Sequence, residues 1–468
     1  MSDKTKGRKA VFTQGSTMRH VIVMTSTAAI GMMALFFVDA VTLFYISKLN
    51  DPAQTAAVGR ASYVIGFLIA VTVGMMIGSS VLIAKSIGQE NQALAKRYGG
   101  SAILGAFLFG AVFATILFIT TDWFLGTLGA TGSSLSHAQT YLRIILPGMP
   151  FMAIGMICMG ILRAWGEAKE SMYITLAGGI FTATLDPIFI FVLDMQVTGA
   201  AVVSLIARLS FALLGLYYVL GTKKLVTWSK LKQVLTDLLD MAKVGVPAMA
   251  TNLAAPVGLF LVAQKVADYG DSAMAGMAVV DRLVPLAFGV IFALSGAVGP
   301  IIGQNFGAGL YDRSRQGLID GIKFNTVYVL FAWGTLYFAR NYIIEAYSAT
   351  GDMALMITLF CTIMAAAFFF NGLLFVTNAA FNNLGKPLWA TAFNWSRQTI
   401  GVVPFVTLGA MWGDLPGIAY GMVLGSVPFA LFAIYVALRL IADLSRQNGS
   451  QIQKNPPQPL AEKGQAKN

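Results

Sequence analysis

Residues 98–121 read YGGSAILGAFLFGAVFATILFITT, an unbroken run of 24 residues without a charged side chain. A transmembrane helix needs about 20 mostly apolar residues to cross the hydrocarbon core of a bilayer. The chain contains eleven further runs of this kind: 19–46, 56–86, 140–162, 171–193, 198–221, 243–267, 273–302, 318–339, 353–381, 388–411 and 416–438. The sequence therefore predicts an all-α integral membrane protein with 12 transmembrane helices.

The composition of the 468-residue chain agrees with this prediction. Apolar residues make up 57% and charged residues 11%, whereas a soluble domain is about one-quarter charged. With only two cysteines and two histidines, the sequence offers no disulfide framework and no Cys- or His-based metal motif. No nucleophile with a nearby base stands out within a span, so we expect neither an enzyme nor a bound cofactor.

The basic residues predict how the chain crosses the membrane. A net charge of +11 would suggest a nucleic-acid partner for a soluble protein, but none is expected for a chain of this kind. Of the 32 Lys and Arg residues, 24 lie at the termini or in connections that follow even-numbered spans. Because cytoplasmic loops are enriched in Lys and Arg, both termini are expected in the cytoplasm.

A repeat divides the membrane region into two halves. Ile87-Gly88-Gln89 recurs as Ile302-Gly303-Gln304 at an offset of 215, and each copy follows an even-numbered span. Two halves of the same orientation are a transporter architecture, with the substrate path between them. The predicted units are a basic cytoplasmic N-terminus (1–18), an N-terminal six-helix lobe (19–221), an amphipathic cytoplasmic linker (222–242), a C-terminal six-helix lobe (243–440) and a disordered cytoplasmic tail (441–468). The linker is either a helix on the membrane surface or a solvated helix.

Two carboxylates stand inside apolar runs, Asp39 in the first span and Asp186 in the fifth. A charge at the bilayer centre costs about 2.5–3.5 kcal/mol, so such residues indicate function unless they only bind a backbone group or a hydroxyl. Pro187 has no N–H and leaves a helix carbonyl free beside Asp186, which suits a cation. Thr182, one turn before Asp186, and Ser204 in the sixth span are expected at a similar depth. We therefore expect Asp39, Asp186, Thr182 and Ser204 to converge in the N-terminal lobe.

The tenth span carries amides instead of acids. Asn371 and Asn378 either line a cavity or hydrogen-bond between helices, and the sequence leaves both alternatives open.

These residues give the chain a family resemblance over about residues 15–440. The motifs are Val38-Asp39, the run Leu185-Asp186-Pro187-Ile188-Phe189-Ile190-Phe191, Gly199-Ala200-Ala201 and the run 302–309, IGQNFGAG. With them the chain resembles the multidrug and toxic compound extrusion (MATE) family of secondary transporters. The resemblance implies two pseudo-symmetric six-helix bundles in a V, alternating access, and export of cationic or amphiphilic compounds in exchange for H⁺ or Na⁺. We also expect a monomer in the bacterial inner membrane.

Departures from the family pattern bear on the coupling ion. Thr182 stands where the family usually has Asn, and Ser204 stands where its sodium site has Thr. Asn371 replaces an acid that one branch of the family carries in its C-terminal lobe. The resemblance then implies coupling in the N-terminal lobe. We expect H⁺ as the coupling ion, because a proton needs only a carboxylate whereas Na⁺ needs several oxygens at once, although Asp39 and Asp186 with two hydroxyls remain a candidate Na⁺ site.

A lipid or polysaccharide flippase of the same superfamily is the alternative. Such a protein often has a basic cavity that holds anionic headgroups. Inside the predicted spans the cations are few, chiefly Arg208, Arg282 and Arg397, which favours the exporter.

Overall fold

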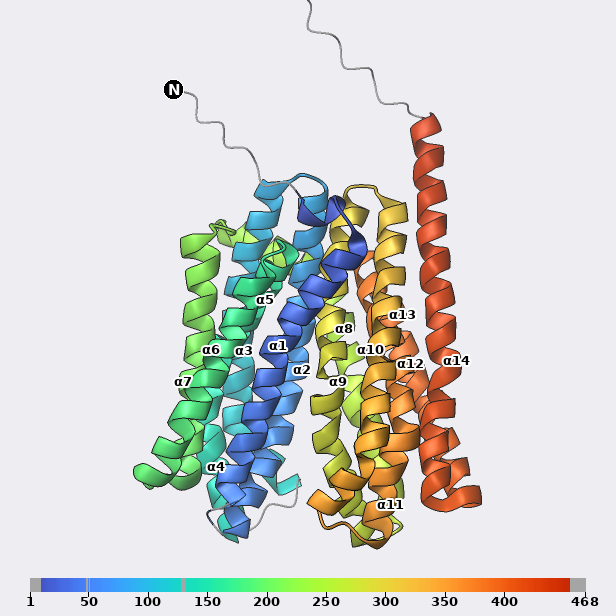
Figure 1. Cartoon of the computed structure of the whole chain (residues 1–468). Helices are drawn as coiled ribbons and strands as arrows, with labels where there is room; N and C mark the ends of the chain where they lie inside the picture. The colour runs from blue at the N-terminus through green and yellow to red at the C-terminus, as the bar shows by residue number, and fades with distance from the viewer. Residues whose placement is uncertain (1–9, 48, 50, 128–131, 455–468) are drawn as a thin grey trace, which may run out of the picture.

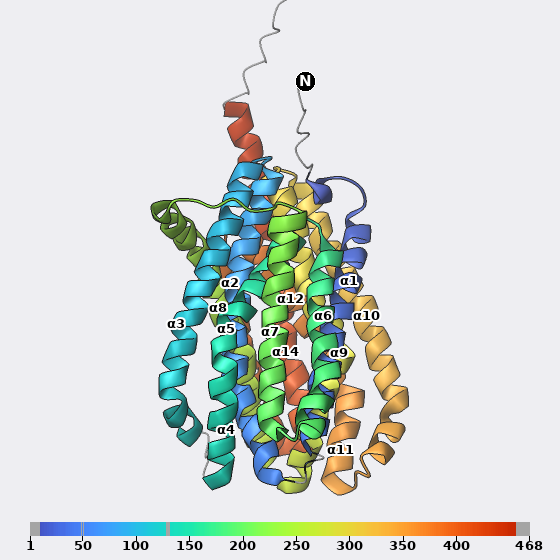
Figure 2. The same cartoon turned by 90° about the vertical axis from the view of Figure 1, so that its left-hand side faces the viewer.

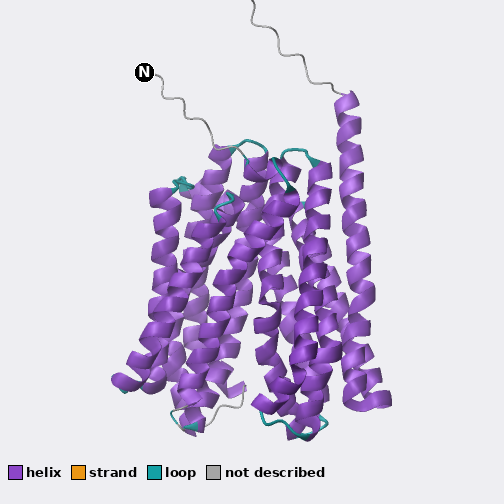
Figure 3. Ribbon diagram, viewed as in Figure 1, coloured by secondary structure: helices purple, strands orange, loops and turns teal. Residues whose placement is uncertain are grey.

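The computed structural model describes residues 10–47, 49, 51–127 and 132–454, and these are almost entirely helical (Figure 3). Apolar runs fold this way because a helix satisfies its own backbone hydrogen bonds, which lipid cannot do. The first half contains η1 (Val11–Thr13), α1 (Thr17–Ser47), α2 (Pro52–Gly88), α3 (Gln92–Thr127), α4 (Gly132–Ile145), η2 (Leu146–Gly148), α5 (Met149–Ala164), α6 (Ala168–Pro187), η3 (Ile188–Val192), α7 (Gln196–Leu216) and η4 (Tyr217–Thr222). The second half contains α8 (Leu231–Ala267), α9 (Asp271–Gly307), α10 (Tyr311–Ala346), α11 (Gly351–Leu359), η5 (Phe360–Met364), α12 (Ala365–Asn383), α13 (Pro387–Ser396), η6 (Arg397–Val402) and α14 (Val403–Lys454).

These elements form the twelve expected crossings within the described part of the chain. Ten segments are long and apolar enough to span a membrane, and α10 is as long but more polar. The last of the ten, Pro387–Gln447, is 61 residues long and contains two crossings. Gly413 and Asp414 have non-helical backbone angles there, and the backbones of Gly409 and Gly417 touch, so the chain folds back on itself.

The crossings are arranged as two lobes that lie side by side (Figure 1). One lobe holds α1 to α7 and the other holds α8 to α14, as the repeat predicts. The beginning of α1 and the end of α14 lie at the same end of the bundle (Figures 1 and 2).

The hydrophobic cores show where the two lobes are joined. At the end where α1 begins, one core combines Phe12, Val21 and Met24 with residues of α9, α12 and α14. At the opposite end the cores are separate: one contains only residues from 45 to 201, the other only residues from 262 to 422. Among the described residues, the buried apolar cores therefore join the two lobes at the first end and are separate at the other. We call these the closed end and the open end.

The N-terminal segment takes part in the closed end, which the predicted boundary at residue 18 did not anticipate. Phe12 is 1% exposed, and its N–H donates to Oε1 of Gln304 over 3.0 Å. Its carbonyl accepts from Asn305 and Arg313, each over 3.0 Å. Residues 10–17 therefore pack across both lobes, whereas residues 1–9 lie outside the described part of the chain.

Two further boundaries differ from the sequence prediction. The expected linker helix begins only at Leu231 and is continuous with α8, after a non-helical stretch over 223–230. Its first turns project from the side of the bundle (Figure 2). The expected tail is helical as far as Lys454, because α14 continues past residue 441; residues 455–468 lie outside the described chain.

Candidate functional site

Asp186 lies on α6 inside the N-terminal lobe and is 1% exposed. Thr42 of α1 donates its hydroxyl to Oδ2 of Asp186, while Oδ1 is buried without a hydrogen-bond partner. Directly after Pro187 the helix changes to π-helical turns over Ile188–Val192, the local rearrangement expected where a proline removes a backbone donor. A buried carboxylate with one donor and one unsatisfied oxygen is poised to take up a cation.

Asp39 lies on α1, three residues before Thr42, so both side chains are near one helix face. Its side chain is exposed to solvent in the static structure, although protein surrounds it on most sides. It accepts no hydrogen bond from the described residues, and it lies within electrostatic range of Asp186 and of Arg208 on α7. The structure therefore brings the two predicted acids together and leaves Asp39 accessible.

The two hydroxyls predicted beside the acids have different surroundings. Thr182 donates to the carbonyl of Gly178, one turn earlier on its own helix, over 3.0 Å. Ser204 lies beside Tyr141 of α4, which is 6% exposed and within electrostatic range of both acids. Among the described residues, neither the Ser204 nor the Thr182 hydroxyl hydrogen-bonds to Asp39 or Asp186.

Sequence reasoning missed Thr42, Tyr141 and the role of Arg208. Nη1 of Arg208 donates to the carbonyl of Ile145 over 3.2 Å, and its guanidinium lies within electrostatic range of Asp39 and Tyr141. Thr42 and Arg208 could have been predicted from their spacing along the helices. Thr42 follows Asp39 by three positions and Arg208 follows Ser204 by four, which places each on the same helix face as its predicted neighbour.

In the C-terminal lobe the predicted amides bind other side chains. Asn371 of α12 accepts from Nη1 of Arg397, which starts η6. Asn378 accepts from Nδ2 of Asn394 of α13 over 2.9 Å. Both contacts join two helices, which is the second of the alternatives left open by the sequence.

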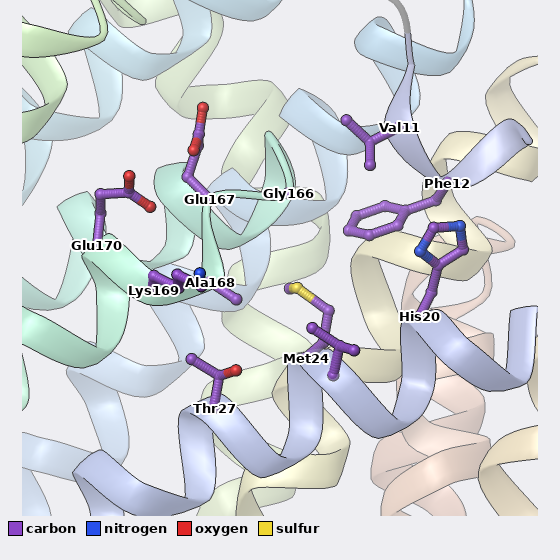
Figure 4. A pocket seen from close by; sticks show the side chains of 11 residues that line it. Val11, Phe12, His20, Met24, Thr27, Gly166, Glu167, Ala168, Lys169 and Glu170 are labelled. Atoms are coloured by element: carbon purple, nitrogen blue, oxygen red, sulfur yellow. The ribbon is translucent and has the colours of Figure 1, made fainter. Parts of the chain in front are cut away.

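A pocket of about 260 Å³ lies at the closed end, between the N-terminal segment, α1 and the start of α6 (Figure 4). Glu167 and Glu170 at its edge each form an ion pair with Lys223, over 2.8 and 2.6 Å. Partial burial disfavours the Lys223 ammonium, but its hydrogen bonds to the two glutamates outweigh this and raise the pKa of Lys223. These carboxylates therefore tie the α7–α8 connection to α6 and are separate from the acid pair.

Two six-helix lobes that lie side by side, with Asp39 and Asp186 brought together in the first, define a multi-pass membrane transporter. The sequence model of the MatE family matches residues 27–188 and 247–407, one segment in each lobe. The chain belongs to this family, and the resemblance to multidrug and toxic compound extrusion transporters is confirmed.

Relatives match along nearly the whole chain. An "FAD transporter" of Shewanella oneidensis is 23% identical over 90% of this chain and 94% of its own length. "Multidrug export protein MepA" of Staphylococcus saprophyticus is 22% identical over 92% of this chain and 95% of its own length. A solved structure described as the outward-facing conformation of a multidrug resistance MATE family transporter has a TM-score of 0.87 and 22% identity, and covers 95% of this chain and 99% of that one. At 22% identity, the similarity to this solved structure shows a shared fold.

Proposed function

We propose that this protein exports cationic or amphiphilic organic compounds across the bacterial inner membrane in exchange for protons, by alternating access. The observation that carries the proposal is the pair Asp39 and Asp186, brought together from α1 and α6 inside one lobe, with Asp39 accessible to solvent. The multidrug-export names of several relatives support the substrate class. The protein would act as a monomer without a cofactor.

The distribution of basic residues supports the direction of transport. The beginning of α1 and the end of α14 lie at the closed end, and the Lys- and Arg-rich connections belong to that side of the chain. By the positive-inside rule this end is cytoplasmic. The open end then faces outward, and the structure is the form that releases substrate and takes up the coupling ion.

The oxygen atoms around the acids favour a proton over sodium. A metal cation needs several oxygen ligands at once. Among the described residues, no group of three or more His, Cys, Asp or Glu side chains comes together. The Thr182 hydroxyl donates a hydrogen bond to the carbonyl of Gly178 and to neither acid. The set of sodium ligands that the family resemblance implies is therefore incomplete here. A proton needs only one carboxylate oxygen, and the unsatisfied Oδ1 of Asp186 supplies one.

The test is transport of a fluorescent lipophilic cation by purified protein in proteoliposomes. Accumulation against the substrate gradient is expected when only a pH gradient is imposed. Uphill transport under a sodium gradient at equal pH on both sides would show sodium coupling and overturn the proton assignment. Lipid scrambling without any effect of the organic cation would instead support the flippase.

A further inference from the structure

Arg208 is a cation inside the membrane region with most of its hydrogen-bonding capacity unused. A guanidinium carries five N–H donors, and among the described residues Arg208 makes one hydrogen bond, to the carbonyl of Ile145. A charged group in a membrane interior is expensive unless it has a partner or lines a water-filled cavity. Arg208 therefore has donors available for a ligand.

Asp39, on α1, lies within electrostatic range of Arg208 on α7. It accepts no hydrogen bond from the described residues, and it forms no ion pair with Arg208 within 4.0 Å, although the two charges interact electrostatically. Two opposite charges that lie near each other without forming an ion pair present both a cation site and an anion site. A ligand carrying both charges satisfies them together.

The position of the guanidinium is determined by its neighbours. The Arg208 side chain runs past Gly148, where a Cβ would lie 3.1 Å from its Cδ. Ile145 and Gly148 flank the junction between α4 and α5, so the carbonyl that holds Nη1 belongs to a short connecting turn. Tyr141 lies within electrostatic range of the guanidinium but forms no hydrogen bond with it among the described residues. The site is thus largely formed before a ligand binds, which lowers the cost of binding.

We propose that Arg208 determines substrate specificity by binding a carboxylate or phosphate, so that the N-terminal lobe selects zwitterionic amphiphiles whose ammonium group faces Asp39. The inference rests on the proposed function and narrows its substrate class. A planar carboxylate matches the guanidinium fork, and a ligand of zero net charge avoids adding charge to the lobe. One relative is named an FAD transporter, and FAD contains phosphate groups. This name agrees with an anion-binding residue in a protein of this fold.

The test compares rhodamine B, a zwitterion, with its ethyl ester, which keeps the cation and loses the carboxylate. Binding to purified protein is measured by fluorescence anisotropy, and transport is measured in proteoliposomes, with protein-free vesicles correcting for leakage. Wild type is expected to bind the zwitterion more tightly than the ester. In Arg208→Gln the affinity for the zwitterion should fall about tenfold or more, while that for the ester changes by less than about twofold. Arg208→Lys should recover part of the loss.

Arg340→Gln is the matched control, because Arg340 lies at the other end of the chain, on α10, and contacts Tyr337 on its own helix. An equal loss for both rhodamines in Arg208→Gln, with Arg208→Lys well folded and no better, would overturn the proposal and leave the exporter function standing. Selective loss of zwitterion binding supports it even if transport proves to be sodium-driven, because binding is measured without a gradient. Failure of wild type to move either dye under any gradient would count against the exporter function alone.

Discussion

The two lobes share an architecture but differ in their chemistry. Pro187 in the N-terminal lobe and Pro404 in the C-terminal lobe are 217 residues apart; π-helical turns begin directly after Pro187 and end two residues before Pro404. Yet Asp186 precedes the first proline, and Val403 precedes the second. Asp186 keeps one buried oxygen without a partner, whereas Asn371 and Asn378 in the other lobe bind Arg397 and Asn394. A repeated fold thus allows two lobes of one architecture to carry different polar groups.

Replacing an acid of the N-terminal lobe is expected to have the largest effect. Asp39→Asn or Asp186→Asn keeps the side-chain volume and removes the ionisable group, so ion-coupled export should fall at least about tenfold while the protein remains folded. Resistance of cells expressing each variant, with expression checked on the same cells, measures this. Normal resistance from well-expressed Asp39→Asn would remove the acid pair from the mechanism.

The hydroxyl neighbours provide a finer test within the same lobe. Thr42→Val removes the donor to Asp186 with little change of shape, whereas Thr182→Val removes a hydroxyl that serves only its own helix. Loss of a hydrogen bond to a charged group costs about 1.5–3 kcal/mol, so Thr42→Val should reduce transport several-fold. Thr182→Val should stay within about twofold of wild type. The reverse order in proteoliposome transport would mean that Thr182 turns toward the acids during the cycle.

In the C-terminal lobe the expected effect falls on stability. Asn378→Ala removes the side-chain acceptor of Asn394 Nδ2, which keeps its bond to the Ala390 carbonyl, so the free energy of unfolding should fall by about 0.5–1.5 kcal/mol. Thermal unfolding in detergent should show a lower midpoint, with transport per folded molecule unchanged. A loss of coupling at unchanged stability would show that the two lobes share the ion pathway.

The smallest effect is expected from removing the end of the chain. Truncation after Asp443 takes away the projecting last turns of α14 and the residues beyond them, together with the partly buried Leu444. Transport should remain within about twofold of wild type, because chain ends make few packing contacts. Loss of transport at normal expression would reveal a function for the end of α14.

The sequence predicted the spans and the acid pair because both depend on strong local signals. Apolar runs determine where helices cross, and an acid such as Asp186 in an apolar run has few structural explanations. The hydrogen-bond partners were harder to predict from the sequence. A hydroxyl such as that of Thr182 can donate to its own helix backbone instead of a neighbouring side chain, and the side-chain rotamer decides which acceptor it reaches. Phe12 could not be placed either: its burial depends on Gln304, almost three hundred residues later.

The contact between the two copies of the Ile-Gly-Gln motif has a mechanical consequence. A Cβ on Gly88 would collide with the backbone of Gln304, and one on Gly307 would collide with the backbone of Lys85. The ends of α2 and α9 therefore approach main chain to main chain, and the Lys85 ammonium lies over the Phe306 ring beside this contact. A methyl group at either glycine would have to push the two helix ends apart, so the spacing of the lobes at the closed end is determined by backbone dimensions. The motif that marks the duplication in the sequence thus lies where the two lobes meet.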